Sequence, residues 1–248
     1  MSFPKVVTKT LKEFKYFSPH TVATAVSILE RLDGKAKVFA GGTDLLPLMK
    51  LRAVTLEYVV NIKNIAGLDY IREEGNMLKI GALTTISTIR ESDLIKRKCF
   101  SVYEATKGFG TPQVRNMATV GGNICRSSPA ADMAPPLMTF DAEVKLVRVK
   151  GERKVLLENF FTGVGESVLD REILTEIAIP LQEEPCVEEC ERLTRTSADL
   201  AKASCAVKIT VHNGRCEDVR IALGAVASTP VRAKKAEQVI KGKGFSDE

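Results

Sequence analysis

Residues 119–136 read TVGGNICRSSPAADMAPP and form one of two stretches that stand out in the sequence. A short run over residues 118–120 predicts a strand that leads into the paired glycines Gly121 and Gly122, after which small and polar residues follow. Glycine and alanine leave room for a flat ligand, while Asn123 and Asp132 can bond to the hydroxyls of a sugar or ribityl chain. The alternative is a tight loop between a sheet and a helix, in which Asp132 caps the helix.

A second stretch has the same arrangement. Residues 40–50 read AGGTDLLPLMK and follow a predicted strand over residues 37–40. The paired glycines Gly41 and Gly42 permit positive φ, so that successive N–H groups can point at one anion, and Thr43 adds a hydroxyl donor. This geometry suits a pyrophosphate, although the stretch is neither a P-loop nor the G-x-G-x-x-G motif of Rossmann folds.

Patterning and turn residues predict a mixed α+β chain. Ser18 and Pro19 suit the start of a helix that Gly34 ends, and Asn213-Gly214 between two apolar runs predicts a β-hairpin. Further strands are predicted over residues 57–62, 77–83, 142–149, 154–157, 172–181, 205–211 and 219–227, with a hairpin turn at 150–152. Further helices are predicted over residues 85–98 and 101–107 and from 229 to near 242, while the acidic residues 183–189 predict an exposed loop or linker.

Composition excludes several classes of protein. The 248 residues include 36 Lys and Arg against 31 Asp and Glu, a net charge of +5, and 44% are hydrophobic, which is ordinary for a globular chain. No run of about 18 apolar residues and no secretory signal is present, which predicts a cytoplasmic protein without a membrane span. The charge is spread evenly and no basic run is interleaved with aromatic residues, so no nucleic-acid partner is expected.

The six cysteines are expected to be reduced thiols. Cys186, Cys190, Cys205 and Cys216 leave a four-cysteine metal site open, but their spacing matches no zinc or iron–sulfur pattern. The simpler interpretation is a mixture of small buried hydrophobic residues and exposed thiols, and no metal ligand is predicted.

Together, the two glycine-paired stretches resemble the FAD-binding medium subunit of molybdenum hydroxylases, a family that includes the medium subunit of carbon monoxide dehydrogenase and the FAD part of xanthine dehydrogenase. The resemblance continues through residues 159–163, 174–180 and 227–233 and covers nearly the whole chain. It implies an α+β fold. A flavin domain of the type seen in vanillyl-alcohol oxidase and p-cresol methylhydroxylase would span residues 1–175, with subdomains of about 1–60 and 61–175, and a small α+β C-terminal domain of the carbon monoxide dehydrogenase type would span 176–248.

The resemblance also implies which residues contact the cofactor. Residues 37–45 would wrap the FAD diphosphate, and residues 119–123 would line the second side, with Thr119 near the flavin and Asp132 on ribityl or ribose hydroxyls. Phe109, Gly110 and Leu174 match residues near the flavin, and Arg192 is the nearest equivalent of a lysine that approaches it in relatives, or else a surface cation. The predicted set is Lys37, Val38, Phe39, Ala40, Gly41, Gly42, Thr43, Asp44, Leu45, Phe109, Gly110, Thr119, Val120, Gly121, Gly122, Asn123, Asp132, Leu174 and Arg192.

Three departures from the family are informative. The two histidines, His20 and His212, lie in no motif, so FAD is expected to bind non-covalently, with Cys125 as the suspect if a covalent link exists. No insertion that would hold an additional iron–sulfur cluster is present. The chain stops soon after Gly244, whereas relatives usually add a further C-terminal segment.

The function implied by the resemblance is that of an oxidoreductase subunit. A large molybdopterin-binding subunit and a small [2Fe–2S] subunit would be its partners, and its FAD would pass electrons to an external acceptor such as NAD. Because flavin chemistry does the work, no catalytic acid–base pair is expected. The alternatives are a free-standing flavin reductase and an assembly scaffold that has lost FAD, and the substrate of the parent complex cannot be named because the hydroxylation site lies on another polypeptide.

Overall fold

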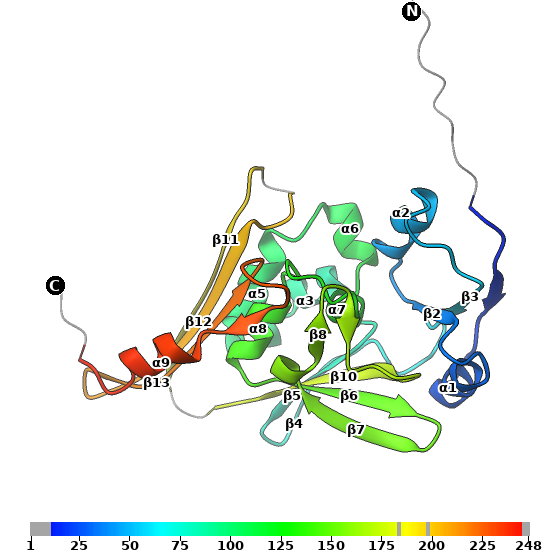
Figure 1. Cartoon of the computed structure of the whole chain (residues 1–248). Helices are drawn as coiled ribbons and strands as arrows, with labels where there is room; N and C mark the ends of the chain where they lie inside the picture. Colours follow the sequence, from blue (N-terminus) through cyan, green and yellow to red (C-terminus); the bar gives the residue numbers. More distant parts are fainter. Residues whose placement is uncertain (1–10, 183–184, 197–198, 245–248) are drawn as a thin grey trace, which may run out of the picture.

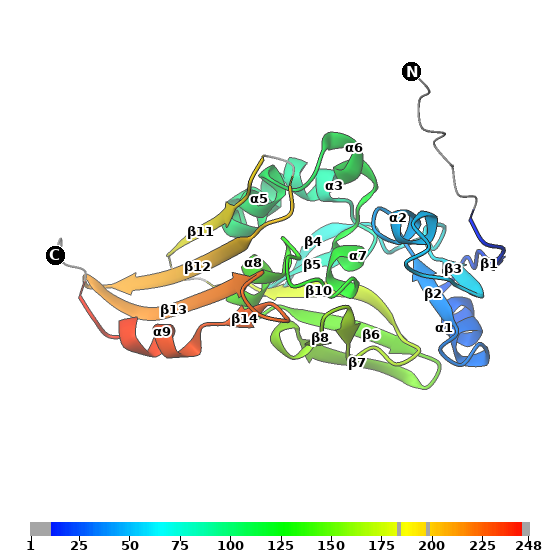
Figure 2. The same ribbon diagram turned by 45° about the horizontal axis from the view of Figure 1, so that its top comes forward.

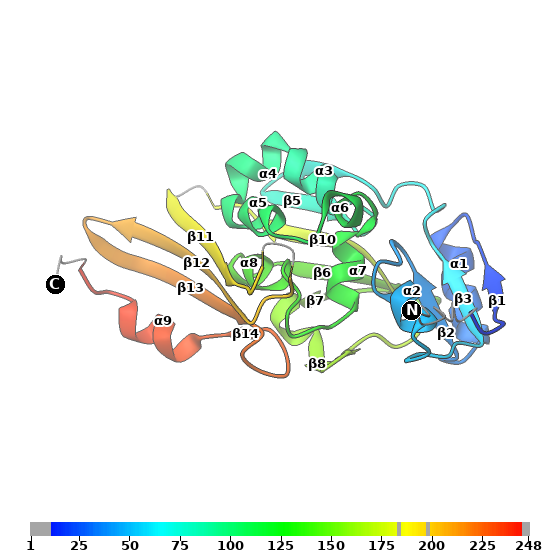
Figure 3. The same cartoon turned by 90° about the horizontal axis from the view of Figure 1, so that it is seen from above.

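Residues 11–182, 185–196 and 199–244 are described by a computed structural model of the chain. Groups of strands and groups of helices follow one another along it, which confirms the α+β prediction (Figure 1). Seen from above, a small sheet near the start of the chain and a long sheet near its end lie at opposite ends of the molecule, with a five-stranded sheet between them (Figure 3). The cofactor-site residues predicted from the sequence come from all three parts.

The first sheet is parallel and has the strand order β1-β3-β2, formed by β1 (Lys15–Phe17), β2 (Ala36–Phe39) and β3 (Tyr58–Asn61). Helix α1 (Val22–Arg31) makes the crossover between β1 and β2. It buries Ala25, Val26 and Leu29 in the hydrophobic core that the helix forms with this sheet. The helix begins later than predicted, because Thr21 rather than Ser18 accepts the capping hydrogen bond, from the N–H of Thr24 at 3.1 Å.

The central sheet is antiparallel and has the order β4-β5-β10-β6-β7. Its strands are β4 (Ile71–Glu74), β5 (Met77–Gly81), β6 (Glu143–Arg148), β7 (Gly151–Leu156) and β10 (Ile173–Pro180). The β6–β7 hairpin turns at residues 149–150, close to the predicted position, and β10 is buried along almost its whole length because it pairs on both sides. The remaining short elements of this region are η1 (Leu157–Asn159), β8 (Phe161–Gly163) and β9 (Glu166–Ser167).

Six short helices pack on one side of the central sheet (Figure 1). They are α3 (Ile86–Glu91), α4 (Asp93–Lys98), α5 (Phe100–Lys107), α6 (Pro112–Met117), α7 (Val120–Cys125) and α8 (Ala134–Thr139). Apolar side chains of the sheet and the helices form one buried core, in which Leu78, Ile80, Ile86 and Ile124 are fully enclosed. The strand predicted over residues 118–120 is wrong: Thr119 forms only an isolated bridge with Thr85, and the chain then enters α7.

The last sheet is antiparallel and consists of β11 (Cys186–Leu193), β12 (Ala203–His212), β13 (Arg215–Gly224) and β14 (Val231–Arg232) (Figure 2). The predicted hairpin at Asn213-Gly214 is confirmed, and both residues have positive φ. Strand β11 occupies part of the predicted loop over residues 183–189, of which 183 and 184 lie outside the described residues. The last helix, α9 (Lys234–Ile240), starts later than predicted, because Val231 and Arg232 first pair with β13.

This last sheet packs on α5 and α8 with an unusual choice of side chains. Along β12, the buried positions that face the helices include Ser204, Lys208 and Thr210, whereas Val207 and Ile209 lie on the opposite face. The ammonium group of Lys208 lies 4.7 Å from the ring centre of Phe140. The interface between the end of the chain and the helices therefore combines these polar side chains with buried apolar ones such as Ala206 and Ala222.

The boundary predicted after residue 175 falls within β10, a strand that pairs with β5 and β6 on either side of that point. The division into domains remains a prediction. Among the described helices, none is long and apolar enough to cross a membrane.

Candidate cofactor site

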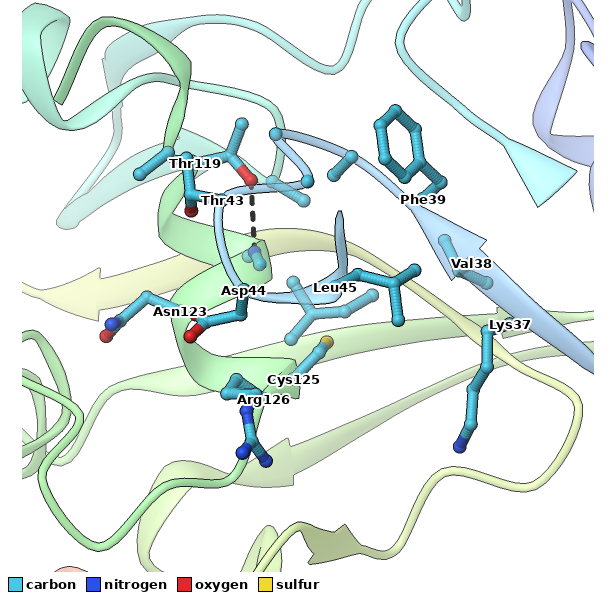
Figure 4. A pocket seen from close by; sticks show the side chains of 18 of the residues that line it. Lys37, Val38, Phe39, Thr43, Asp44, Leu45, Thr119, Asn123, Cys125 and Arg126 are labelled. Carbon is cyan, nitrogen blue, oxygen red and sulfur yellow. Dashed lines mark hydrogen bonds between the residues drawn. The ribbon is translucent and has the colours of Figure 1, made fainter. Parts of the chain in front are cut away.

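A cavity of about 340 Å³ lies where three segments distant in sequence meet. One wall is formed by residues 37–45, which run from β2 into α2 (Leu45–Lys50), a second by residues 118–126 around α7, and a third by residues 172–174 at the start of β10. Figure 4 shows side chains from the first two walls around this space. The volume is within the range of cofactor sites, which is roughly 300–1,000 Å³.

The loop after β2 presents backbone donors that the protein does not use. Gly42 has a φ of +74°, and the carbonyls of Gly42 and Asp44 accept from the N–H groups of Leu46 and Leu48. Within the described residues, none of the N–H groups of residues 41–45 donates to a backbone acceptor. A run of uncommitted N–H groups next to a cavity is an arrangement that binds anions such as phosphate.

Gly41 also allows this loop to approach the chain before α7. A Cβ atom there would overlap the carbonyl oxygen of Met117 and lie 2.9 Å from its carbonyl carbon. Any side chain at this position would therefore push the loop away from the second wall of the cavity.

The second glycine pair differs from the first in that its backbone donors are already used. The N–H groups of Val120, Gly121 and Gly122 donate to the carbonyls of Thr84 and Ala82 and to Oγ1 of Thr119, respectively, so none of the three is free for an anion. A Cβ atom on Gly121 would lie 2.7 Å from the Ala82 carbonyl oxygen. This glycine is needed for close packing of α7 on the end of β5, and Gly122 keeps the cavity side of the helix free of a side chain.

Fifteen of the nineteen predicted cofactor residues line this cavity. They include all of residues 37–45, both Phe109 and Leu174, and four residues of the α7 segment. The four that do not line it are Gly110, Val120, Asp132 and Arg192. Their predicted contacts with a cofactor remain predictions.

Asp132 and Arg192 line a second cavity of about 150 Å³ between α5 and β11. Nη1 of Arg192 lies 3.4 Å from Oδ1 of Asp132, and both side chains are more than four-fifths buried, so Arg192 is not a plain surface cation. Burial raises the pKa of Asp132 to about 6, although the charge of Arg192 opposes the shift. The alternative role of Asp132 as a helix cap is wrong, because α8 begins after Met133 and has no side-chain cap.

Sequence reasoning missed several residues of the larger cavity. Arg126 follows α7 directly and its exposed side chain lies at the cavity (Figure 4). Glu172, which immediately precedes β10, also lines the cavity. The two carboxylate oxygens of Glu172 accept from Nε and Nη2 of Arg153 at 2.8 and 2.7 Å, and this hydrogen-bonded pairing raises the pKa of Arg153. Arg126 begins the polar stretch Arg126-Ser127-Ser128 of the same motif, so the sequence offered it as a candidate. The pair between Glu172 and Arg153 joins residues whose proximity no sequence pattern indicates.

Cys125 also lines the larger cavity. Burial raises the pKa of its thiol to about 12, so the group stays protonated near neutral pH and is a weak nucleophile. Among the described residues there is no group of three or more His, Cys, Asp or Glu side chains that could hold a metal ion.

Comparisons with known proteins give two family matches along the chain. Residues 12–182 match the model of the FAD binding domain in molybdopterin dehydrogenase, and residues 190–248 match the CO dehydrogenase flavoprotein C-terminal domain. The sequence is 35% identical over 236 residues to the carbon monoxide dehydrogenase medium chain of Hydrogenophaga pseudoflava, covering 95% of this chain and 82% of the relative. It is 33% identical over 231 residues to the xanthine dehydrogenase FAD-binding subunit of Escherichia coli O157:H7, covering 91% and 79%.

Solved structures agree with these matches. The carbon monoxide dehydrogenase from Hydrogenophaga pseudoflava that lacks the Mo-pyranopterin moiety of its cofactor superposes with a TM-score of 0.93 at 36% identity, covering 96% of this chain and 83% of that one. Quinoline 2-oxidoreductase from Pseudomonas putida 86 superposes with a TM-score of 0.89 at 26% identity, covering 96% and 82%.

Proposed function

Since this chain belongs to the family of FAD-binding medium subunits of molybdenum hydroxylases, we propose that its larger cavity holds FAD and that the bound flavin passes electrons to an external acceptor such as NAD. The family resemblance seen in the sequence is confirmed, and with it the two-part α+β fold, FAD as the cofactor and the assignment as an oxidoreductase subunit.

The observation that carries the site assignment is the run of uncommitted N–H groups over residues 41–45. Their loop would hold the diphosphate, because backbone donors oriented around one point replace the water that solvates a phosphate. Opposite the loop, Gly122 leaves the face of α7 open, and its neighbour Asn123 uses only its Oδ1, which accepts from the N–H of Met133 at 3.3 Å. The amide NH2 of Asn123 is therefore available for a hydroxyl of the cofactor.

The apolar residues of the cavity suit the flavin ring. Phe109 and Leu174 are both less than one-tenth exposed and both line the cavity. They would exclude water from the ring and fix its plane. When bound, FAD supplies the electron chemistry, taking electrons singly and releasing them in pairs, and the protein contributes position and environment.

Non-covalent attachment is part of the proposal. Cys125, the suspect for a covalent link, is half-buried and protonated, and neither His20 nor His212 lines the cavity. FAD should leave the chain completely when the protein is precipitated with acid.

We further propose that a large molybdopterin-binding subunit and a small [2Fe–2S] subunit deliver the electrons, and that the complex is cytoplasmic. Relatives named as medium chains or FAD-binding subunits support the assignment to a multi-subunit enzyme. The chain is the exit of the electron path in this proposal, because the flavin is the group that can change from one-electron to two-electron transfer.

Two measurements separate the parts of the proposal. Titration of the purified chain with FAD, followed by quenching of flavin fluorescence, should saturate at one FAD per chain, and a colourless protein that takes up no FAD would favour the scaffold alternative. The holo-protein is then reduced with one equivalent of dithionite, so that no excess remains to reduce NAD⁺ directly. It is mixed with NAD⁺ without oxygen, and NADH should form as the flavin is reoxidised. If FAD binds but NAD⁺ leaves it reduced, the acceptor is another molecule, and turnover driven by NADPH in the isolated chain would favour a flavin reductase.

A further inference from the structure

Arg192 connects the C-terminal sheet to the turn that carries Phe109. It lies on β11, which packs against α5 (Figure 1). Its side chain lines the second cavity. Nη1 donates to the carbonyl of Gly108 and Nη2 donates to the carbonyl of Asp199. Gly108 ends α5, and the next residue, Phe109, lines the larger cavity.

The turn at residues 108–110 is held by two arginines from opposite sides. Arg115 of α6 donates from Nη1 to the carbonyls of both Phe109 and Gly110, at 2.9 Å each. Arg192 takes the remaining carbonyl, that of Gly108. The three consecutive carbonyls are therefore bonded to charged donors. Arg115 follows the turn closely in sequence, whereas Arg192 belongs to the C-terminal sheet.

The absence of a side chain at Gly108 leaves the space that Arg192 occupies. A Cβ atom there would lie 2.7 Å from Cδ and 2.9 Å from Nη1 of Arg192, and its three nearest heavy atoms would all belong to Arg192. The backbone of Gly108, with φ of −93° and ψ of 0°, is open to any residue, so its lack of a side chain matters here for space alone.

The same guanidinium group faces Asp132, at 3.4 Å from Oδ1. Oδ1 of Asp132 and Nε of Arg192 are buried and have no hydrogen-bond partner among the described residues. A hydroxyl group in the adjoining cavity would satisfy both atoms at once, because it donates to the first and accepts from the second. Arg192 thus holds both a wall residue of the larger cavity and a predicted FAD contact.

We propose that Arg192 is a positioning residue through which the C-terminal sheet controls FAD binding: it fixes the turn at Gly108 and Phe109 and orients Asp132, so that cofactor affinity depends on the contact between β11 and α5. The inference rests on the proposed assignment of the larger cavity as the FAD site. Arg192 acts through the turn and through Asp132.

The test measures the Kd of FAD for the full chain in four variants. Arg192→Ala should raise the Kd roughly 10- to 100-fold, the effect of losing hydrogen bonds to a charged group. Arg192→Lys, which keeps a charge but not the two-pronged donor, should restore part of the affinity. Gly108→Ala should raise the Kd in the wild-type background but change it less than about twofold when added to Arg192→Ala, because its new methyl group then enters space that the arginine has left.

The matched control is Arg195→Ala. Arg195 lies in the segment that follows β11, and its exposed side chain pairs with Asp199 without lining either cavity. This variant should bind FAD like the wild type. The visible spectrum of FAD-saturated Arg192→Ala should also be shifted, since Phe109 no longer holds its place beside the flavin, and a merely structural arginine would lower the melting temperature without changing this spectrum.

Each result has one meaning. If the wild type binds no FAD, the proposed function is wrong. If the wild type binds FAD and Arg192→Ala binds it equally well, or if the effects of Gly108→Ala and Arg192→Ala simply add, then Arg192 does not act through the turn and the inference is overturned. Where Arg192→Ala fails to fold, Gly108→Ala and Arg192→Lys still decide the question.

Discussion

Replacing Gly41 with alanine tests whether the loop after β2 holds the FAD diphosphate. The new Cβ atom would overlap the carbonyl oxygen of Met117 and lie 2.9 Å from its carbonyl carbon, whereas ordinary contacts between carbon atoms are about 3.5–4.0 Å. Both atoms belong to the backbone, so no side chain can turn aside. The loop must move by roughly 1 Å, and overpacking of this kind costs about 1–3 kcal/mol of folding free energy.

The same shift should weaken FAD binding more than it weakens the fold. An N–H group bonded to a phosphate oxygen contributes about 1.5–3 kcal/mol, and losing one such bond raises the Kd roughly 10- to 150-fold. The melting temperature of the apo-protein should fall by roughly 2–12 °C, given about 2–4 °C per kcal/mol for a chain of this size. Titration calorimetry with FAD and thermal unfolding of the apo-protein measure the two quantities separately.

Gly81→Ala is the matched control. Its Cβ atom would overlap the carbonyl oxygen of Leu68 and lie 2.6 Å from the carbonyl carbon, a clash of the same kind at a place that does not line the cavity. This variant should lose stability and keep its FAD affinity within about twofold. Equal FAD affinity in Gly41→Ala and the wild type would refute the assignment of the loop, and an equal loss in both variants would attribute the effect to general destabilisation.

Three further predictions concern the rest of the chain. Arg232→Met should lower the free energy of unfolding by about 3–5 kcal/mol in chemical denaturation, because it removes a guanidinium group only 4% exposed, which leaves Glu237 without its cation and Asp141 paired with Arg220 alone; a loss below about 1 kcal/mol would contradict this. Cys125 should resist alkylation at pH 8 in the native protein, since burial raises its pKa to about 12, and rapid modification measured by mass spectrometry would contradict that state. Burial raises the pKa of Asp132 to about 6, so the folded state binds this proton more tightly than the unfolded state; the stability from this group is present below about pH 4 and is lost as the pH rises through 6. Relative to the wild type, Asp132→Asn should therefore gain stability as the pH rises from about 4 to about 6, by at most roughly 3 kcal/mol, and a difference independent of pH would refute the shift.

The sequence predicted the elements that local rules determine. The hairpin at Asn213-Gly214 follows from the turn chemistry of two residues, and β10 follows from an apolar run that ends at Pro180. Strand β11 was missed because its inward positions, among them Cys186, Glu188 and Arg192, are not the apolar residues that strand patterns look for. Glu188 accepts from the backbone N–H and hydroxyl of Ser101 on α5, so a tertiary contact and not hydrophobic burial explains this polar position.

The two glycine pairs show the limit of motif reasoning at the site itself. Both follow an extended segment and both reach the same cavity, as the sequence suggested. Their donors differ, because Gly121 bonds to Ala82 and Gly122 to the side chain of Thr119, while residues 41–45 have no such partners. Which N–H groups remain free depends on neighbours that fold against them, and a single sequence does not encode those neighbours in its spacing.

The position of β10 has a consequence for folding during synthesis of the protein. This strand is the last of the five central strands to leave the ribosome, yet it lies in the middle of their sheet and separates β5 from β6. Until β10 is synthesised, the hairpins β4–β5 and β6–β7 have no strand that pairs with both of them. Each hairpin then has an open edge that can pair with another nascent chain. The third wall of the cavity arrives with β10, since Leu174 is its second residue. If this cavity is the FAD site, as proposed, it is complete only in a chain whose five central strands have all been synthesised.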